Sequence, residues 1–244
     1  MHSADETTPE VRDLVDVAAR SLAEIRDAPS DRPMVVAQLG QSLDGRIATL
    51  SGHSQWINGA YALDHLHALR AVVDAVVVGV GTVLADDPRL TVRRVAGTHP
   101  ARVVIDPNGR IPNTAKCFED TGTSRYCVMT RHRSVAPGVV PILVPLRETG
   151  MAPADIIAAL FALNLRRILI EGGTDTISRF IDAGMVDRLQ VLLAPVVLGS
   201  GRPGITLRPI GTVDEALRPL TRSHIFPDGD VLFDCDLRRR KTSD

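Results

Sequence analysis

The chain has 244 residues, of which 44% are hydrophobic and 23% charged, and its formal net charge at pH 7 is -1. This length and composition can bury a full core in one large domain or two small ones. No run of basic residues supplies the broad positive field that would attract a nucleic acid or an anionic membrane. A small-molecule ligand is therefore favoured.

Neither a membrane span nor a metal site is indicated by the residue patterns. The longest apolar runs, 75–80 and 191–198, are far shorter than a bilayer requires, and residues 1–10 are polar and acidic rather than signal-like. We therefore expect a cytoplasmic protein. The three cysteines are widely spaced and outside any C-x-x-C motif, and no histidine pair has zinc-ligand spacing, so we expect core thiols and no metal. These cysteines are Cys117, Cys127 and Cys235.

The first expected element is an amphipathic helix. Pro9 suits the first helical position, and an apolar stripe continues until just before Pro29. The stripe consists of Val11, Leu14, Val15, Ala18, Leu22 and Ile25. We therefore divide the chain into an N-terminal helical extension and linker, 1–33, and a catalytic domain, 34–244.

Two segments with possible site residues follow. A strand is expected over 34–39, and then a glycine-containing turn and a short return strand. The polar loop 51–58 holds the only tryptophan, Trp56, which is either a core filler or a ring at the mouth of a pocket. Asn58 is expected to cap the next helix. After a buried strand over 74–80, the polar run 81–93 is either a solvated loop or a place where arginines bind a phosphate.

The middle of the chain alternates strands and helices. Strands are expected over 101–106, 125–129 and 139–144, and Pro153 opens an amphipathic helix. The basic residues Arg131 and Arg133 directly follow the second of these strands. They form either an ordinary solvated turn or a site for the 2′-phosphate of an adenosine.

The stretch 167–179 gives the strongest site signal. An apolar run ends at Glu171, two glycines follow, and hydroxyl and carboxylate residues then open a helix. The first N–H groups of such a helix can bind an anion, although a glycine pair also serves simply to turn the chain. Glu171 favours a ligand site, because open α/β sheets bind ligands at the carboxyl ends of their strands.

The remaining elements complete the predicted fold. A strand is expected over 188–194, a flexible loop over 198–204, and a hairpin from 221–226 and 230–236 turned at 227–229. Alternating strands and helices that end in a hairpin predict an α/β fold. Its sheet is mixed and mostly parallel, flanked by helices, with a C-terminal antiparallel hairpin.

Five motifs lie in order along the chain. They are SLDGR at 42–46, SGHSQWI at 51–57, GTVLADDPRLTVR at 81–93, EGG at 171–173 and APVVLGSG at 194–201. Together they resemble the motifs of the reductase domain of bacterial riboflavin-biosynthesis deaminase/reductase proteins. The resemblance covers nearly all of residues 34–237.

The resemblance implies a dihydrofolate-reductase-like fold, NADPH as hydride donor and a homodimer. The implied reaction reduces the ribosyl group of 5-amino-6-(5-phosphoribosylamino)uracil to the ribityl product by hydride transfer to C1′. A stand-alone reductase is expected, because the residues before 34 have no counterpart of the zinc deaminase half.

The resemblance also assigns site residues. The substrate contacts that it implies are Ser54, Arg70, Leu90, Arg93 and Glu171. The NADPH contacts are Gly40, Trp56, Thr82, Asp86, Pro107, Gly173, Thr174, Asp175, Thr176, Ile177, Ser178 and Arg179. Glu171 and Asp86 are the candidate catalytic residues: Glu171 is expected to hold the pyrimidine or the ribose, and Asp86 to help fix the nicotinamide.

Two positions depart from the pattern of the family. Gln38 stands where bacterial members often have a lysine, and His53 stands where an acidic residue is frequent. The missing lysine either alters substrate choice or leaves charge handling to Arg46. Two other functions stay open: an NADPH reductase of the same fold that acts on a pterin or a secondary metabolite, and a non-catalytic NADP-binding module.

Overall fold

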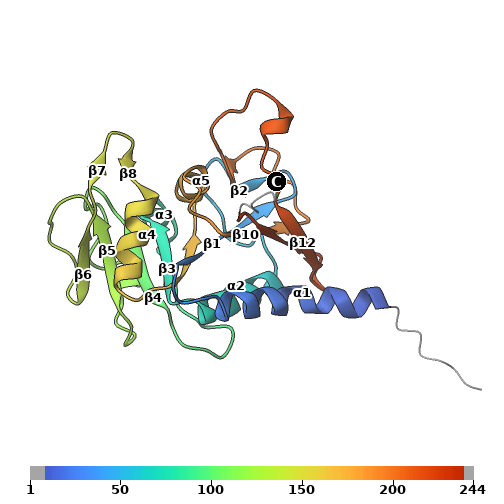
Figure 1. Cartoon of the computed structure of the whole chain (residues 1–244), viewed down its shortest axis with the longest axis horizontal. Helices are drawn as coiled ribbons and strands as arrows, with labels where there is room; N and C mark the ends of the chain where they lie inside the picture. Colours follow the sequence, from blue (N-terminus) through green and yellow to red (C-terminus); the bar gives the residue numbers. More distant parts are fainter. Residues whose placement is uncertain (1–8, 239–244) are drawn as a thin grey trace, which may run out of the picture.

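A nine-stranded sheet forms the centre of the computed structural model, which describes residues 9–238 and, within them, side chains from residue 17 onward (Figure 1). The strand order is β12-β13-β10-β1-β9-β3-β4-β5-β6. The strands are β1 (Met34–Ser42), β3 (Ala75–Gly79), β4 (Ala101–Ile105), β5 (Arg125–Met129), β6 (Val139–Leu143), β9 (Arg167–Glu171), β10 (Arg188–Ala194), β12 (Leu220–Ile225) and β13 (Val231–Asp236). All neighbours from β10 to β6 pair in parallel, and β13 and β12 pair antiparallel at one end. The expected mixed sheet with a C-terminal hairpin is confirmed.

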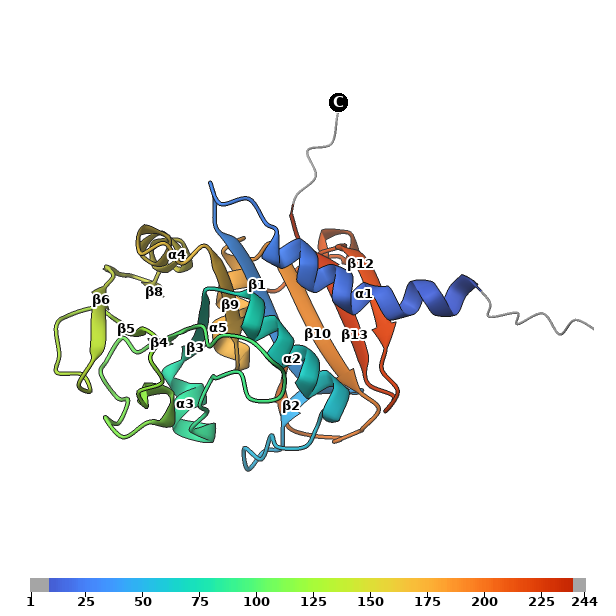
Figure 2. The ribbon, with the colours of Figure 1, turned by 90° about the horizontal axis from the view of Figure 1, so that it is seen from below.

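Helices cover both faces of this sheet (Figures 1 and 2). One face carries α1 (Pro9–Arg26), α2 (Ala60–Val72) and α3 (Val80–Asp86), and the other carries α4 (Pro153–Ala162) and α5 (Thr174–Asp182). Strands β3 and β9 are almost continuous apolar runs because each must fill both cores. In β3, for example, Val76 and Val78 face the α1–α3 core, whereas Val77 faces the α4–α5 core.

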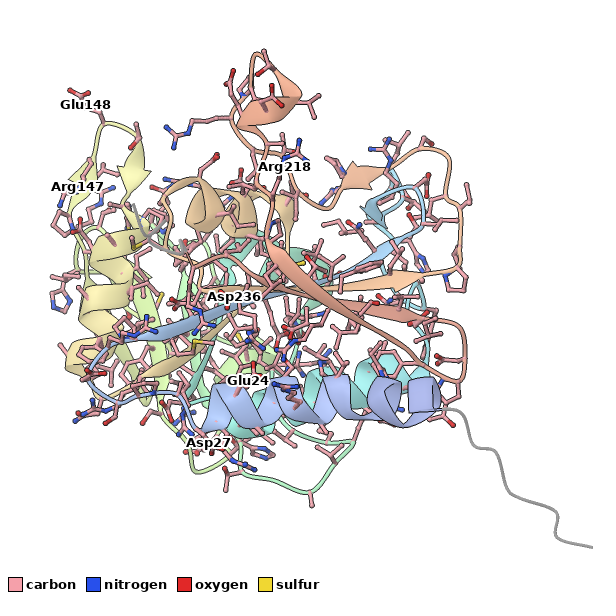
Figure 3. The ribbon with its side chains drawn as sticks, turned by 45° about the vertical axis from the view of Figure 1, so that its right-hand side comes forward. Glu24, Asp27, Arg147, Glu148, Arg218 and Asp236 are labelled. Atoms are coloured by element: carbon pink, nitrogen blue, oxygen red, sulfur yellow. The ribbon has the colours of Figure 1, made fainter. Side chains whose placement is uncertain are left out.

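The expected N-terminal helix is present as α1. Ile25 is fully buried, and Leu22 packs against the same core. The side chains of three other predicted stripe residues, Val11, Leu14 and Val15, lie outside the described residues. Glu24, labelled on α1 in Figure 3, fixes the helix to the C-terminal strands. It accepts hydrogen bonds from Arg188 and Arg222 at 2.6 and 2.7 Å. The Arg222 bond outweighs partial burial and, with Arg188, lowers the pKa of Glu24 to about 2.

The loop after β10 is not the free segment that its glycines suggested. It forms β11 (Arg202–Pro203), which pairs with β2 (Arg46–Ala48). Asp44 accepts the N–H groups of Leu198 and Gly199 at 3.0 and 2.8 Å.

A small hairpin formed by β7 (Leu146–Arg147) and β8 (Gly150–Met151) stands beside the sheet, with Arg147 and Glu148 near its tip (Figure 3). Two 3₁₀ turns, Lys116–Phe118 and Val213–Glu215, complete the elements.

Two local expectations were wrong. In the run 81–93, read as a solvated loop or a phosphate-binding segment, residues 81–86 belong to the helix α3 and only 87–93 lack regular secondary structure. Only Val80 and Val83 are buried in this short helix, so its sequence carries little apolar periodicity. Asn58 does not cap α2, whose N-cap is Gly59. Its Nδ2 instead donates to the Leu192 carbonyl and to Asp230 Oδ2, both at 3.1 Å. Tertiary hydrogen bonds therefore outweighed the local capping preference of asparagine.

The three cysteines are free and buried, as expected of core thiols. Burial raises the pKa of Cys117 and of Cys127 to about 12, so both remain protonated. Among residues 9–238, no helix is long and apolar enough to cross a membrane. The same residues hold no group of three or more His, Cys, Asp or Glu side chains that could bind a metal ion.

Candidate active site

A cleft of about 1090 Å³ lies at the carboxyl ends of the central parallel strands. Gly40 lines it at the end of β1, Glu171 at the end of β9, Gly79 at the end of β3 and Ile105 at the end of β4. Because parallel strands end at the same edge, the segments that leave them converge there, as in other open α/β sheets.

The N-terminus of α5 opens into this cleft. Gly173, its N-cap, donates its N–H to Thr82 Oγ1 at 3.1 Å. The next three N–H groups, of Thr174, Asp175 and Thr176, have no hydrogen-bond partner in the described part of the chain. Gly172, with φ +108°, has no space for a side chain, because a Cβ would lie 2.7 Å from Thr82 Oγ1. The start of α5 therefore offers free N–H donors, the positive end of the helix dipole and a glycine that keeps the main chain bare. Such a site can bind an anion such as a diphosphate.

A buried ion pair forms another wall of the cleft. Arg70 donates from Nε and Nη2 to the two oxygens of Glu171, at 2.7 and 2.6 Å, and both side chains are 8% exposed. A third bond joins Arg70 Nη1 to the Thr91 carbonyl at 3.2 Å. Burial opposes the Arg70 charge, but the Glu171 carboxylate outweighs it and raises the pKa of Arg70. Most donors of Arg70 are therefore engaged within the protein, and Glu171 is held in one orientation.

Arg93 is a cation next to this pair that no carboxylate neutralises. It donates from Nη1 to Thr91 Oγ1 at 2.8 Å, and no carboxylate of the described residues pairs with it. Partial burial and then the charges of Arg70 and Arg89 lower its pKa. Its backbone N–H donates to Nδ1 of the buried His67 at 2.9 Å. Burial, followed by Arg70 and Arg93, lowers the pKa of His67 to about 4, so that His67 is neutral at pH 7. An unpaired cation in a positive field suits a phosphate monoester.

Other predicted residues meet at the mouth of the cleft. Ser54 Oγ donates to Asp86 Oδ1 at 3.1 Å, which joins a residue assigned to substrate with one assigned to cofactor. Trp56 is 82% exposed and lines the cleft, so it is not a core filler. Leu90 is 1% exposed with φ +57°, a conformation that is uncommon for a side chain of this size. Because its side chain is in the core, Leu90 can contact a ligand in the cleft only through its main chain.

The cleft brings together all but two of the predicted site residues. The exceptions are Ile177 and Ser178, whose side chains are buried under α5, where Ser178 Oγ accepts the N–H of Thr206. The residues that do line it are Gly40, Ser54, Trp56, Arg70, Thr82, Asp86, Leu90, Arg93, Pro107, Glu171, Gly173, Thr174, Asp175, Thr176 and Arg179. The 3.6-residue period of α5 accounts for the two exceptions, since it turns one side of every surface helix toward the core.

The structure also identifies cleft residues that the sequence did not single out. Arg110, in the turn after β4, lines the cleft, whereas Arg131 and Arg133 do not. The Arg133 stem instead packs at Gly109, which has φ +66° and where a Cβ would lie 2.5 Å from Arg133 Cδ. Gln38 lines the cleft, but Arg46, the other candidate for charge handling, does not. An arginine directly after a P-N-G turn at a strand end was the available signal for Arg110.

Comparison with known proteins agrees with this geometry. The family model described as the RibD C-terminal domain matches residues 33–223. The riboflavin biosynthesis protein RibD of Aquifex aeolicus is 31% identical over 195 residues, which are 77% of this chain and 53% of that protein. The 2,5-diamino-6-ribosylamino-4(3H)-pyrimidinone 5′-phosphate reductase of Methanothermobacter thermautotrophicus is 35% identical over 75% of this chain and 87% of its own length. The chain thus spans about half the length of the first relative and most of the second.

Solved structures give the same result. The diaminohydroxyphosphoribosylaminopyrimidine deaminase/5-amino-6-(5-phosphoribosylamino)uracil reductase of Thermotoga maritima superposes with a TM-score of 0.71 and 26% identity, over 85% of this chain and 57% of that one. The dihydrofolate reductase of Enterococcus faecalis has a TM-score of 0.50 and 11% identity, over 84% of this chain and 97% of that one, and so shares the fold alone. The expected dihydrofolate-reductase-like fold is confirmed. The matched family, the shared fold and the cleft at the strand ends agree, and the chain belongs to the RibD C-terminal domain family.

Proposed function

We propose that the chain is an NADPH-dependent reductase of riboflavin biosynthesis. It reduces the ribosyl group of a ribosylamino-pyrimidine 5′-phosphate, such as 5-amino-6-(5-phosphoribosylamino)uracil, to the ribityl product by hydride transfer to C1′. One observation carries the proposal: a single cleft joins an open helix N-terminus to a free arginine beside a buried carboxylate–guanidinium pair. A dinucleotide and a sugar phosphate need these two kinds of anion site side by side.

The chain's own residues provide a place for each part of the dinucleotide. The free N–H groups at the start of α5 hold the diphosphate. Ile105, Pro107 and Arg110 lie at the β4 side of the cleft and receive the adenosine. The exposed guanidinium of Arg110 supports NADPH over NADH, because a 2′-phosphate is the group that distinguishes them. Trp56 and Asp86 then lie near the reduced ring, which supplies the hydride.

At the substrate side, Arg93 binds the 5′-phosphate and Glu171 orients the ribosylamino-pyrimidine. Glu171 acts mainly by position, since Arg70 neutralises much of its charge and fixes both of its oxygens. Each oxygen retains a lone pair that can accept a hydrogen bond from the substrate. Alignment of the reacting carbon within a cleft from which water is displaced is the main contribution that this reaction needs from a protein.

Three further elements of the proposal do not depend on a contact in the cleft. They are the homodimer, the cytoplasmic location, and the division of the chain into residues 1–33 and a reductase domain, 34–244. In support of the division, the family match begins at residue 33. Sedimentation of the purified chain tests the dimer directly.

The proposal is tested by following NADPH oxidation with three compounds. They are 5-amino-6-(5-phosphoribosylamino)uracil, 2,5-diamino-6-ribosylamino-4(3H)-pyrimidinone 5′-phosphate and a dihydropterin. We expect turnover of at least one of the first two and none of the dihydropterin. The chain should also restore growth to riboflavin-requiring cells that lack their own reductase. Turnover confined to the dihydropterin, or nucleotide binding without turnover of any compound, would refute the proposal.

A further inference from the structure

Three polar side chains form a row across the centre of the sheet. Gln38 of β1 is in register with Gln190 of β10 on one side and with Glu171 of β9 on the other. Neighbouring residues in register on parallel strands point to the same face and lie about 4.8 Å apart. This face is the one covered by α1 and α2, since Val36 and Leu169, two residues earlier in β1 and β9, belong to that core.

The two outer members of the row have partners on those helices. Gln190 is fully buried; its Oε1 is 2.9 Å from Nε2 of His65, and its Nε2 donates to Ser21 Oγ at 2.8 Å. Glu171 is bound at both oxygens by Arg70. The fold therefore gives each polar side-chain atom of the outer two residues at least one partner, as buried polar groups require.

The middle member, Gln38, has no such partner. It is 4% exposed, yet its carboxamide makes no hydrogen bond to any of the described residues. It lines the cleft, and neither amide atom is among the buried polar atoms sealed away without a partner. The amide atoms of Gln38 therefore face the cleft with their hydrogen-bonding capacity unused by the protein, which is where a bound ligand can supply the partners.

We propose that the Gln38 carboxamide pairs with the lactam edge of the substrate pyrimidine, accepting from N3–H and donating to the C4 carbonyl. The inference rests on the proposed function and names the atoms that it recognises. A carboxamide presents one acceptor beside one pair of donors, which matches an adjacent N–H and C=O. A lysine at this position could only donate. Glu171, beside Gln38 in the row, then lies next to the same heterocycle.

This pairing has a consequence for substrate choice. The pyrimidinone and the uracil named above both carry N3–H and a C4 carbonyl, and they differ in the group at C2, an amino group or an oxygen, and in the proton at N1. A side chain that reads the lactam edge does not distinguish them. The reductase should therefore accept the pyrimidine before or after its deamination at C2, with affinities that depend equally on Gln38.

The test compares two substitutions of the same kind in the same row. Gln38→Met and Gln190→Met each replace a carboxamide by an unbranched apolar side chain of similar size. Binding of both nucleotides is measured by calorimetry without cofactor, and stability is measured by urea unfolding. We expect Gln38→Met to weaken binding of both nucleotides at least tenfold, with an unfolding midpoint equal to or above that of the wild type. Gln190→Met should lower the midpoint and leave binding within twofold.

Three results would overturn the inference while the proposed function stands. One is that Gln38→Met binds the nucleotides as tightly as the wild type does, although the wild-type enzyme turns them over. Another is a fall in the unfolding midpoint as large as that of Gln190→Met, which would mean that Gln38 has a partner within the protein. A loss confined to one nucleotide would mean that Gln38 reads the C2 group, and it would overturn the lactam assignment. If the wild type neither binds nor turns over either nucleotide, the proposed function fails, and the assignment fails with it.

Discussion

The Arg70–Glu171 pair makes a prediction in which stability and activity separate. Glu171→Gln keeps the size of the side chain and one oxygen that can accept from Arg70, but it removes the charge. Arg70 is 8% exposed and would then carry an unneutralised buried charge. Removing one member of such a pair typically costs 3–5 kcal/mol, and because one hydrogen bond survives we expect a loss of about 3 kcal/mol in the free energy of unfolding. We also expect turnover to fall at least tenfold, or about 1.4 kcal/mol in transition-state stabilisation.

Urea unfolding at pH 7, followed by far-ultraviolet circular dichroism, measures the stability term. Fluorescence is a poor reporter, because the only tryptophan, Trp56, is already 82% exposed in the folded chain. Glu24→Gln is the matched control. It removes the charge of a carboxylate that also binds arginines, Arg188 and Arg222, but outside the cleft. It should lower stability and leave the turnover of the folded enzyme unchanged.

A double variant separates the two roles of the pair. Replacing both charges with apolar side chains, Arg70→Met with Glu171→Leu, leaves no uncompensated charge, so stability should return to within about 1 kcal/mol of the wild type or exceed it. Turnover should remain at least tenfold reduced, because the groups that orient the substrate are missing. Wild-type turnover in Glu171→Gln, or recovery of turnover in the double variant, would refute the role assigned to Glu171.

Three further changes have defined outcomes. In Gly40→Ala, the new Cβ would overlap Asn58 Oδ1 and displace its side chain, so unfolding in urea should show a loss of about 1–3 kcal/mol. His67 has a folded-state pKa of about 4, so between pH 6.5 and 4 the unfolded chain binds a proton that the folded chain does not, and stability should fall by up to roughly 3 kcal/mol. His67→Asn, which keeps an acceptor for the Arg93 N–H, should flatten that fall in unfolding curves taken across this range, and an unchanged fall would assign it to another group. Arg110→Ala should weaken NADPH binding about tenfold in calorimetry and leave NADH unchanged, whereas Arg131→Ala should change neither; equal losses in both variants would return the 2′-phosphate to the 131–133 turn.

The fold was predictable where a segment must be buried. Strands β5 and β10 have the boundaries that their β-branched and apolar runs indicated, because buried strands are rich in apolar residues even where single polar positions interrupt them. The helix α3 was missed, since only two of its seven residues are buried and the rest resemble a loop. The loop after β10 was misjudged for a similar reason: its order depends on Asp44, 154 residues away, and no local pattern encodes such a contact.

The sequence predicted which residues line the cleft, but not which of them contact each other. The resemblance named Arg70 and Glu171 separately, as two substrate contacts. In the structure each is the main partner of the other, and the neighbouring Arg93, which has no carboxylate partner among the described residues, is a cation available for a phosphate. Pairing depends on how α2 crosses β9, an arrangement that spans 101 residues and that no spacing in the sequence reveals. In the same way, Arg110 lines the cleft and Arg131 does not because of the path of two neighbouring loops.

The register of the sheet links the core to the polar row beneath the cleft. Val36 and Gln38 point to the same face of β1, as Leu169 and Glu171 do in β9, because strand side chains alternate with a period of two. A shift of β1 by one residue would turn Gln38 toward α4 and α5. An apolar side chain would then occupy the middle position of the polar row. The apolar residues that fix this register therefore also determine which polar atoms a substrate meets. For that reason we expect single-residue insertions within β1 to abolish binding as well as stability.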